Sequence, residues 1–273
     1  MPEFQRVFLS RASGFLFAAA LTISSVFALD PGKTLTQYSH RVWGQEEGLF
    51  QPTIYSILQT RDGFIWLGTQ DSLIRFDGVH FREFNNGNAF FERSLIRALV
   101  EDTRGNLWVA SVGSGIARID LKGSVTRYTE QNGLPSSNAF CLDSDSRGAV
   151  WICTDRGLAR LTNGYIRIFN QAEGLPGNQV RASCEAVDGT RWVAGIDFGL
   201  SRWSGAHFEA YSDTVVRPGE KFSALLCAHD GSIWAGGSGL VHITGTGSRR
   251  LTTRDGLPDN QISSLAESSD GAL

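Results

Sequence analysis

Short apolar stretches alternate with turn residues along most of the chain. The first group of stretches reads "IYSILQT", "FIWLGT", "SLIRFD" and "HFREF", joined by turns rich in Asp and Gly. In "FIWLG" both alternating faces are apolar, which is typical of a strand that is covered on both sides. This pattern predicts an all-β protein in which four short strands form one unit.

The four-strand unit repeats, and a tryptophan marks each copy. The tryptophans are spaced by 42, 43, 41 and 42 residues: Trp66, Trp108, Trp151, Trp192 and Trp234. Four strands in a period of this length match one blade of a β-propeller. We therefore expect a β-propeller of four-stranded blades, with about five complete blades and a partial sixth within residues 29–273.

Each tryptophan is expected to be a core residue rather than a ligand platform. Trp66 shares a strand face with Gly68, so the large ring lies beside a gap that side chains of the next blade can fill. The gap position holds a small residue in every unit: Gly68, Ala110, Cys153, Ala194 and Gly236.

Two kinds of connection separate the strands. The Asp62-Gly63 step predicts a two-residue hairpin turn, because glycine accepts a positive φ without steric cost. The stretches "NGLPSSN" and "EGLPGNQ" predict links in which Gly ends an outer strand and Pro prevents the ladder from continuing. We expect these links to be structural.

The first 28 residues have the features of a secretory signal peptide. Arg6 and Arg11 precede the apolar segment "FLFAAALTI", and small or aliphatic residues at 26–28 fit a cleavage site after Ala28. An uncleaved anchor is the alternative, because residues 12–29 carry no charge. Both alternatives place the rest of the chain outside the inner membrane, which predicts a periplasmic location.

The stretch "LTQYSHRVWGQEEGL" reads as the end of a repeat that lacks its first three strands. Tyr38 stands where Tyr128, Phe169 and Tyr211 stand before their Gly-Leu links. We expect this segment to close the ring as the outer strand of a blade whose other strands come later in the chain. Because the sixth unit stops before its tryptophan, we also expect the chain to be part of a longer protein.

Export permits disulfide bonds, and the chain has four cysteines. Cys141 and Cys153 are centred on the turn at Arg147, so a tight hairpin would place them opposite each other. Because Cys153 fills the small-residue gap, we prefer a small buried side chain there, with a disulfide as the alternative. Cys184 and Cys227 have no C-x-x-C spacing, which suggests neither zinc binding nor redox catalysis.

Neither charge nor motifs point to chemistry in this chain. The formal net charge is −3 without a basic block, so we expect no nucleic-acid contact and no polybasic membrane contact. No nucleophile elbow or phosphate loop occurs, and the histidines form no cluster: His40, His80, His207, His229 and His242. We assign no catalytic residue, metal ligand or cofactor, and whether the full protein is an enzyme stays open.

Two features could hold a ligand. One is a cation at the same place on the third strand of each unit: Arg75, Arg118, Arg160, Arg202 and His242. Because it recurs in every unit, we expect it to pair with a turn carboxylate and to support the scaffold. The other feature is a pair of segments that replace the Gly-Leu-Pro link, 85–94 and 212–222, which are our first candidates for ligand-binding loops. The ligand-binding residues themselves are unknown.

The stretch "YSILQTRDGFIWLGTQDSLIRFDG", together with "NGLPSSN" and "EGLPGNQ", resembles the two-component regulator propeller repeat. The resemblance runs from about Gln37 to the end, and the fourth unit departs from it because Arg191 replaces an aliphatic residue. It implies the extracytoplasmic sensor domain of a bacterial transmembrane receptor, with seven blades in the full propeller. It also implies a homodimer, a transmembrane helix, and a histidine kinase or diguanylate cyclase output domain that this chain lacks.

Two hypotheses for function follow. In the first, the propeller binds a periplasmic ligand, with a saccharide among the candidates, and relays its presence to a cytoplasmic output domain. The alternative is a secreted propeller enzyme of the lyase or hydrolase kind, similar in blade design to streptogramin lyases, or a free binding protein. A transmembrane helix and output domain after the propeller favour the sensor, whereas a stop codon after a closing blade favours the alternative.

Overall fold

The computed structural model describes residues 41–51, 53–85, 87–91, 93–268 and 270–273. The signal segment at 1–28 and the expected closing strand around Tyr38 lie outside the described residues. The chain divides into two units, Met1–Val42 and Trp43–Leu273. All strands assigned among the described residues belong to the second unit.

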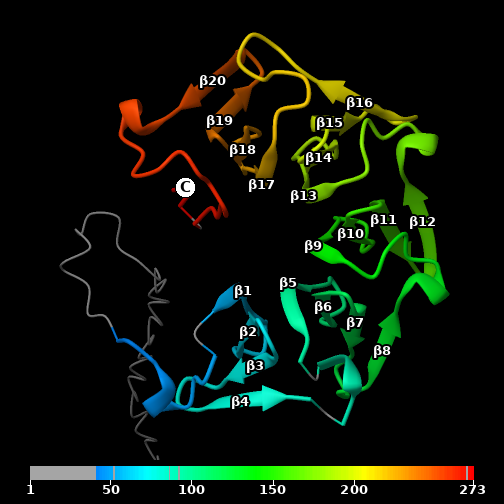
Figure 1. The fold of residues 1–273 in the computed structure, drawn as a ribbon, viewed down its shortest axis with the longest axis vertical. Helices are drawn as coiled ribbons and strands as arrows, with labels where there is room; N and C mark the ends of the chain where they lie inside the picture. The colour runs from blue at the N-terminus through cyan, green and yellow to red at the C-terminus, as the bar shows by residue number, and fades with distance from the viewer. Residues whose placement is uncertain (1–40, 52, 86, 92, 269) are drawn as a thin grey trace, which may run out of the picture. The chain divides into compact units, whose positions relative to one another are not determined.

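Five antiparallel four-stranded sheets, or blades, make up the second unit (Figure 1), which confirms the predicted propeller architecture. The first strands of the sheets are β1 (Ile54–Gln59), β5 (Leu95–Glu101), β9 (Ala139–Ser144), β13 (Val180–Glu185) and β17 (Phe222–Cys227). The second strands are β2 (Ile65–Thr69), β6 (Leu107–Val112), β10 (Val150–Thr154), β14 (Arg191–Gly195) and β18 (Ile233–Gly237). The third strands are β3 (Leu73–Phe76), β7 (Gly115–Ile119), β11 (Gly157–Thr162), β15 (Gly199–Trp203) and β19 (Gly239–Thr244). The fourth strands are β4 (Phe81–Phe84), β8 (Val125–Tyr128), β12 (Tyr165–Phe169), β16 (Phe208–Tyr211) and β20 (Gly247–Leu251).

The first strand of each sheet is its inner strand. From β5 onward, each inner strand contacts the inner strand and the second strand of the preceding sheet. Figure 1 accordingly shows the five sheets around a common centre, with the fourth strands farthest from it. Consecutive blades therefore pack face to face, which explains why both faces of the second strands are apolar.

Short 3-10 helices connect one blade to the next or precede the first blade. They are η2 (Gln45–Glu47), η3 (Ala89–Phe91), η4 (Glu130–Asn132), η5 (Gln171–Glu173) and η6 (Thr253–Asp255). The Gly of each Gly-Leu link is the C-cap of such a helix, as at Gly133 with φ 98°. This differs from the expectation that the glycine ends the outer strand directly: the strand has already ended at Tyr128, and a capped helical turn intervenes.

The hairpin turns between the first and second strands have three residues rather than the predicted two. Thr60 and Phe64 form the last hydrogen-bonded pair, and Gly63 donates its N–H to the Thr60 carbonyl at 2.8 Å. Gly63 has φ 89°, whereas Asp62 does not have a positive φ. A turn that needs one left-handed residue at its third position accounts for this geometry, and a two-residue turn of the Asp-Gly kind would need two.

The predicted gap beside each tryptophan is where the next blade packs. A Cβ added at Gly68 would lie 2.7 Å from Ile96 Cγ2, and one at Gly236 would lie 2.6 Å from Ile262 Cγ2. Trp66 and Ile96 belong to one buried cluster that spans the first two blades. The tryptophans are thus core residues, as expected, although Trp234 is half-buried.

Residues 261–268 begin a sixth repeat. Ile262 packs into the gap at Gly236, and its carbonyl accepts a hydrogen bond from Ser223 Oγ at 3.1 Å. The Ser268 N–H donates to the Ala272 carbonyl and the Gly271 N–H to the Ser268 carbonyl, which is the bonding of the other hairpin turns. The segment therefore takes the course of a further inner strand beside β17.

The preference for an unpaired Cys153 is wrong. Cys141 lies directly opposite Cys153 in the β9–β10 register, their Cα atoms are 4.9 Å apart, and the two residues form a disulfide. Burial and cross-linking occur together here, since Cys153 is fully buried and its partner Cys141 is partly buried. Cys184 and Cys227 form a second disulfide between the inner strands β13 and β17, with a Cα–Cα distance of 5.7 Å.

Arg191 marks a second departure from the repeat. Its side chain is only 4% exposed, pairs with the carboxylate of Asp143 on the preceding blade, and stacks on Trp151 at 4.7 Å. The same two positions hold Val100 and Val150 at the preceding blade interface. A buried ion pair thus replaces an apolar pair, and Nε and Nη2 of Arg191 have no hydrogen-bond partner among the described residues.

The disulfides give a direct prediction. Alkylation of the denatured, unreduced protein should label no cysteine thiol, because all four cysteines are paired. The Cys184→Ser/Cys227→Ser variant should lose about 4 kcal/mol of unfolding free energy, and Cys141→Ser/Cys153→Ser about 3 kcal/mol, since the first bond closes the longer loop. Urea unfolding measures both values; two labelled thiols per chain would contradict the pairing.

The buried ion pair gives a second prediction. Arg191→Val alone should lower the unfolding free energy by about 3–5 kcal/mol, because it leaves the Asp143 carboxylate unpaired in the blade interface. The double variant Asp143→Val/Arg191→Val restores the apolar pair and should recover most of that loss. Urea unfolding of Arg191→Val, Asp143→Val and the double variant checks this; purely additive losses would contradict it.

Candidate ligand-binding site

Every inner strand carries a β-bulge at the same register. In the first blade, Ile54 pairs with Thr69 and Ser56 with Gly68, which leaves Tyr55 without a partner residue on β2. The equivalent bulged residues are Arg97, Phe140, Arg181 and Ser223. We call these five the rim residues. A bulge redirects one side chain out of the sheet pattern, and bulges are enriched beside functional sites.

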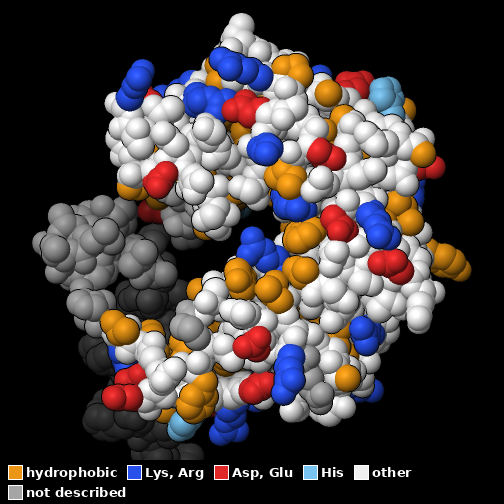
Figure 2. Space-filling view, viewed as in Figure 1, with side chains coloured by type: hydrophobic (Ala, Val, Ile, Leu, Met, Phe, Trp, Pro, Cys, Tyr) orange, Lys and Arg blue, Asp and Glu red, His pale blue; other side chains and the backbone are white. Residues whose placement is uncertain are grey.

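In four of the five blades, the residue before the bulge explains why the rim side chain is turned away from the core; in the first blade the equivalent residue, Ile54, is exposed. Ile96, Ala139, Val180 and Phe222 occupy that position and are all fully buried between blades. The next residue along, the rim residue, is partly or fully exposed in every blade. Figure 2 shows Lys or Arg side chains and hydrophobic side chains together at the inner edge of the blades.

The rim differs from the core in that its chemistry does not repeat. Core positions keep the same residue type from blade to blade, whereas the rim holds two aromatics, two arginines and a serine. Packing therefore does not dictate residue type at the rim. A position with constant geometry and variable chemistry is where a repeat protein can build a binding site.

The two rim arginines lie over the two rim aromatics. Cζ of Arg97 lies 4.9 Å from the ring centroid of Tyr55, and Cζ of Arg181 lies 3.9 Å from that of Phe140. Each arginine reaches back to the preceding blade, so the same cation–π arrangement occurs twice around the centre. Burial lowers the pKa of Arg181, and the Arg97 cation adds to this effect, whereas Asp155 opposes it.

The nearby acids are already hydrogen-bonded to the links between blades. Asp155 Oδ2 accepts a bond from Asn138 Nδ2 at 2.8 Å, and Asp197 accepts from the backbone N–H groups of Asn178 and Gln179. Burial alone would raise the pKa of Asp155, but hydrogen bonds from Ser136 and Asn138 outweigh it and lower the value. These carboxylates order the links, while the rim arginines keep donors available.

The first predicted ligand loop, 85–94, contributes two side chains to the core, while Asn85, Gly87, Ala89 and Arg93 are exposed. Phe90 and Phe91 in η3 are fully buried in the cluster around Trp66, and Ser94 Oγ donates to the Phe90 carbonyl. The segment lacks the Gly-Leu-Pro link because two phenylalanines close the interface between the first two blades. Its role in ligand binding stays a prediction.

The second predicted loop, 212–222, is tied to its neighbours. Arg250 donates to the Val215 carbonyl at 3.0 Å and to Glu220 at 2.8 Å. Burial would raise the pKa of Asp213, but hydrogen bonds from Ser248 and from the Val215 and Val216 N–H groups hold it at about 2. This loop also has an evident structural function, and its ligand contact stays a prediction.

The third-strand cations support the blades, as expected from their recurrence. Arg160 pairs with the turn carboxylate of Asp145 at 3.3 Å, Arg75 lies over Phe64 at 4.4 Å, and His242 stacks on Trp234. None of them is a rim residue. The expected pairing with a turn carboxylate is thus seen at Arg160 alone among the five: Arg75 and His242 stack on aromatic rings, Arg118 donates to Thr126 Oγ1 at 3.3 Å, and Arg202 is exposed.

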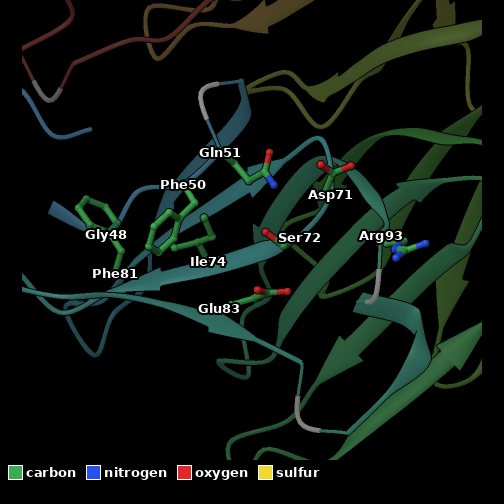
Figure 3. Close-up of a pocket in the computed structure, with 9 residues that line it drawn as sticks. All are labelled: Gly48, Phe50, Gln51, Asp71, Ser72, Ile74, Phe81, Glu83 and Arg93. Atoms are coloured by element: carbon green, nitrogen blue, oxygen red, sulfur yellow. The ribbon is translucent and has the colours of Figure 1, made fainter. Parts of the chain in front are cut away.

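A hollow of about 540 Å³ lies against the first blade (Figure 3). Figure 3 shows Phe50, Ile74 and Phe81 toward one end and Asp71 and Arg93 toward the other. The residues equivalent to Ile74 are Ala117, Ala159, Ser201 and Val241, which are all fully buried. In the clusters that contain them, Ala117 and Ala159 face the preceding blade. The hollow is therefore the surface on which a preceding blade would pack.

The described residues contain no cluster of three His, Cys, Asp or Glu side chains that could hold a metal ion. No helix in this part of the chain is long and apolar enough to cross a membrane. None of the described histidines is a rim residue: His80 and His207 directly precede the outer strands β4 and β16, His242 lies on the third strand β19, and His229 lies in a hairpin turn.

The rim could have been found by comparing the repeats column by column. Aligned on the bulge, the inner segments read "IYSILQ", "IRALVE", "AFCLDS", "VRASCE" and "FSALLC". The second column varies in size and charge, while the columns beside it stay apolar or small. The search for catalytic motifs missed it because no single residue there has a diagnostic spacing.

Comparisons with known proteins agree with this fold. Residues 48–71 match the family model described as "Two component regulator propeller". The extracellular domain of a proposed hybrid two component system from B. thetaiotaomicron superposes with a TM-score of 0.66 and 21% identity, covering 78% of this chain and 32% of that one. A proposed one component system from the same organism gives a TM-score of 0.60 and 21% identity, covering 73% and 30%.

Virginiamycin B lyase from Staphylococcus aureus is also similar, with a TM-score of 0.62 and 17% identity, covering 76% of this chain and 73% of the enzyme. No curated protein sequence matches significantly. The chain spans about one third of the length of the two extracellular domains that it resembles. At these identities the solved structures establish the fold, which is an all-β propeller, and the family match shows the two component regulator propeller repeat at residues 48–71.

Proposed function

We propose that this chain is the ligand-sensing propeller of a transmembrane signal-transduction receptor, located in the periplasm and coupled to a histidine kinase or diguanylate cyclase output domain. The observation that carries the proposal is the rim, where five geometrically equivalent positions present different chemistry. The similarity to extracellular domains of two component systems supports a sensory role. Two disulfides fit an oxidising compartment outside the cytoplasm.

In this proposal the ligand binds at the rim and the blades provide a rigid support. The inner strands are fixed by interblade packing and, between β13 and β17, by a disulfide. A ligand that bridges rim residues of several blades contacts several inner strands at once. Its binding can therefore favour one arrangement of those strands over another in the full ring. An unidentified periplasmic ligand, with a saccharide among the candidates, and a homodimer in the full receptor belong to the same proposal.

A propeller lyase is the second candidate, because the lyase structures superpose over most of their own length. One solved structure of that enzyme is a catalytically inactive histidine-to-alanine variant. In the part of this chain that the structure describes, no histidine lies at the rim. This placement favours the sensor, and incubation with a streptogramin B, followed by liquid chromatography, distinguishes the two: conversion of the streptogramin to a new product would support the lyase.

The rim gives the test of the sensor. In the full-length protein, Tyr55→Ser should shift the ligand concentration for half-maximal output by tenfold or more, because Tyr55 is exposed at the rim and holds Arg97. Tyr165→Ser is the matched control, since Tyr165 is an exposed tyrosine on the outer strand β12. Output activity is measured against a panel of soluble oligosaccharides, with thermal unfolding as the check on folding.

Equal responses from the two tyrosine variants would contradict the assignment of the rim. A full-length gene that encodes neither a membrane-spanning helix nor an output domain would contradict the receptor itself. The two results are independent, so the location of the site and the type of protein are tested separately.

A further inference from the structure

The two rim arginines are held in place without being neutralised. Among the described residues, neither Arg97 nor Arg181 has a carboxylate within ion-pair distance. Five other described arginines do pair with a carboxylate: Arg61 with Glu101, Arg156 with Glu130, Arg160 with Asp145, Arg191 with Asp143 and Arg250 with Glu220. The rim arginines are therefore ordered by stacking on aromatic rings instead.

Stacking leaves the hydrogen-bonding edge of a guanidinium open. A guanidinium has five N–H donors in its own plane, and the ring beneath it uses none of them as an ordinary acceptor. Arg181 uses one donor for the Val180 carbonyl, at 3.3 Å. The donors that are left can bind two oxygens of a carboxylate, sulfate or phosphate group at once.

The neighbouring acids Asp155 and Asp197 offset part of the charge of Arg181 at a distance, but neither forms an ion pair with a rim arginine. Asp155 and Asp197 are engaged by Asn138 and by backbone N–H groups. The Arg97 cation lowers the pKa of Arg181, after the larger effect of burial, so the two like charges are close enough to act on each other. Bringing like charges together in a partly buried place costs free energy unless an anion binds between or beside them.

We propose, on the basis of the proposed function, that the rim recognises a ligand that carries at least two oxyanion groups, one bound by Arg97 and one by Arg181. The two arginines occupy the same register on β5 and β13, with β9 between them, so the cation–π pair is repeated after two blades. This repetition suits a ligand with repeated anionic groups. Tyr55 and Phe140 act as positioning residues, because they fix the guanidinium planes.

Calorimetry with the purified full-length protein tests the proposal. The probes are trigalacturonate for carboxylates, a trisulfated disaccharide for sulfates, inositol hexakisphosphate for phosphates and maltotriose as a neutral saccharide. We expect at least one anionic probe to bind and maltotriose not to bind. Arg97→Gln and Arg181→Gln should each weaken that binding about tenfold, and added salt should weaken it further.

Two further variants distinguish specific binding by the rim guanidinium groups from a general effect of positive charge on the protein surface. Arg82→Gln removes an exposed arginine from the outer strand β4 and should leave the affinity unchanged. Arg181→Lys keeps the charge but loses the planar donor set, so it should bind more weakly than the wild type and more tightly than Arg181→Gln. Thermal unfolding of each variant confirms that the propeller is intact.

Three results would overturn the proposal: no binding by any anionic probe, equal binding by the wild type and both Gln variants, or binding of maltotriose that both Gln variants retain. If maltotriose binding is lost in Tyr55→Ser but kept in both Gln variants, the rim is a site for a neutral ligand. In that case the oxyanion inference fails while the proposed sensory function stands.

Discussion

The structure depends on how a side chain from one blade enters the gap beside the tryptophan of the preceding blade. Ile96 occupies the space at Gly68, and Ile262 does so at Gly236, at distances that leave no room for a Cβ. A sheet with two apolar faces cannot remain in water, so each blade needs a neighbour on both sides. The gap therefore fixes the spacing between blades and demands a small residue at one position of every repeat.

This constraint also explains the rim. Since the residue that enters the gap must point between the blades, the chain needs an extra residue before it resumes the ladder with the second strand, and the bulge supplies it. The extra side chain is excluded from the interface and faces the inner side of the blades. Scaffold and site are thus adjacent in sequence but independent in chemistry, which permits the rim to change while the packing stays constant.

The repeat, the tryptophan core and the scaffold role of Arg160 were predictable, because each depends on local sequence and recurs. The turn length was not, because Asp-Gly is compatible with turns of two or three residues. The disulfide between Cys184 and Cys227 depends on the contact of two blades, which spacing within one hairpin cannot show.

Arg191 was visible as an exception in the sequence. Its partner Asp143 lies in the preceding repeat, so the ion pair can be recognised only when the interface between the two blades is known. The rim escaped motif searches because its defining property is a register, not a residue type.

The most direct measurement is a crystal structure of the full-length propeller bound to a ligand that triggers its output. We predict that the ligand contacts Arg97 and Arg181 at the inner ends of β5 and β13, and that the backbone of both bulges is unchanged. A ligand bound against the outer strands, or at the 212–222 loop without contact to the rim, would contradict the assignment of this site.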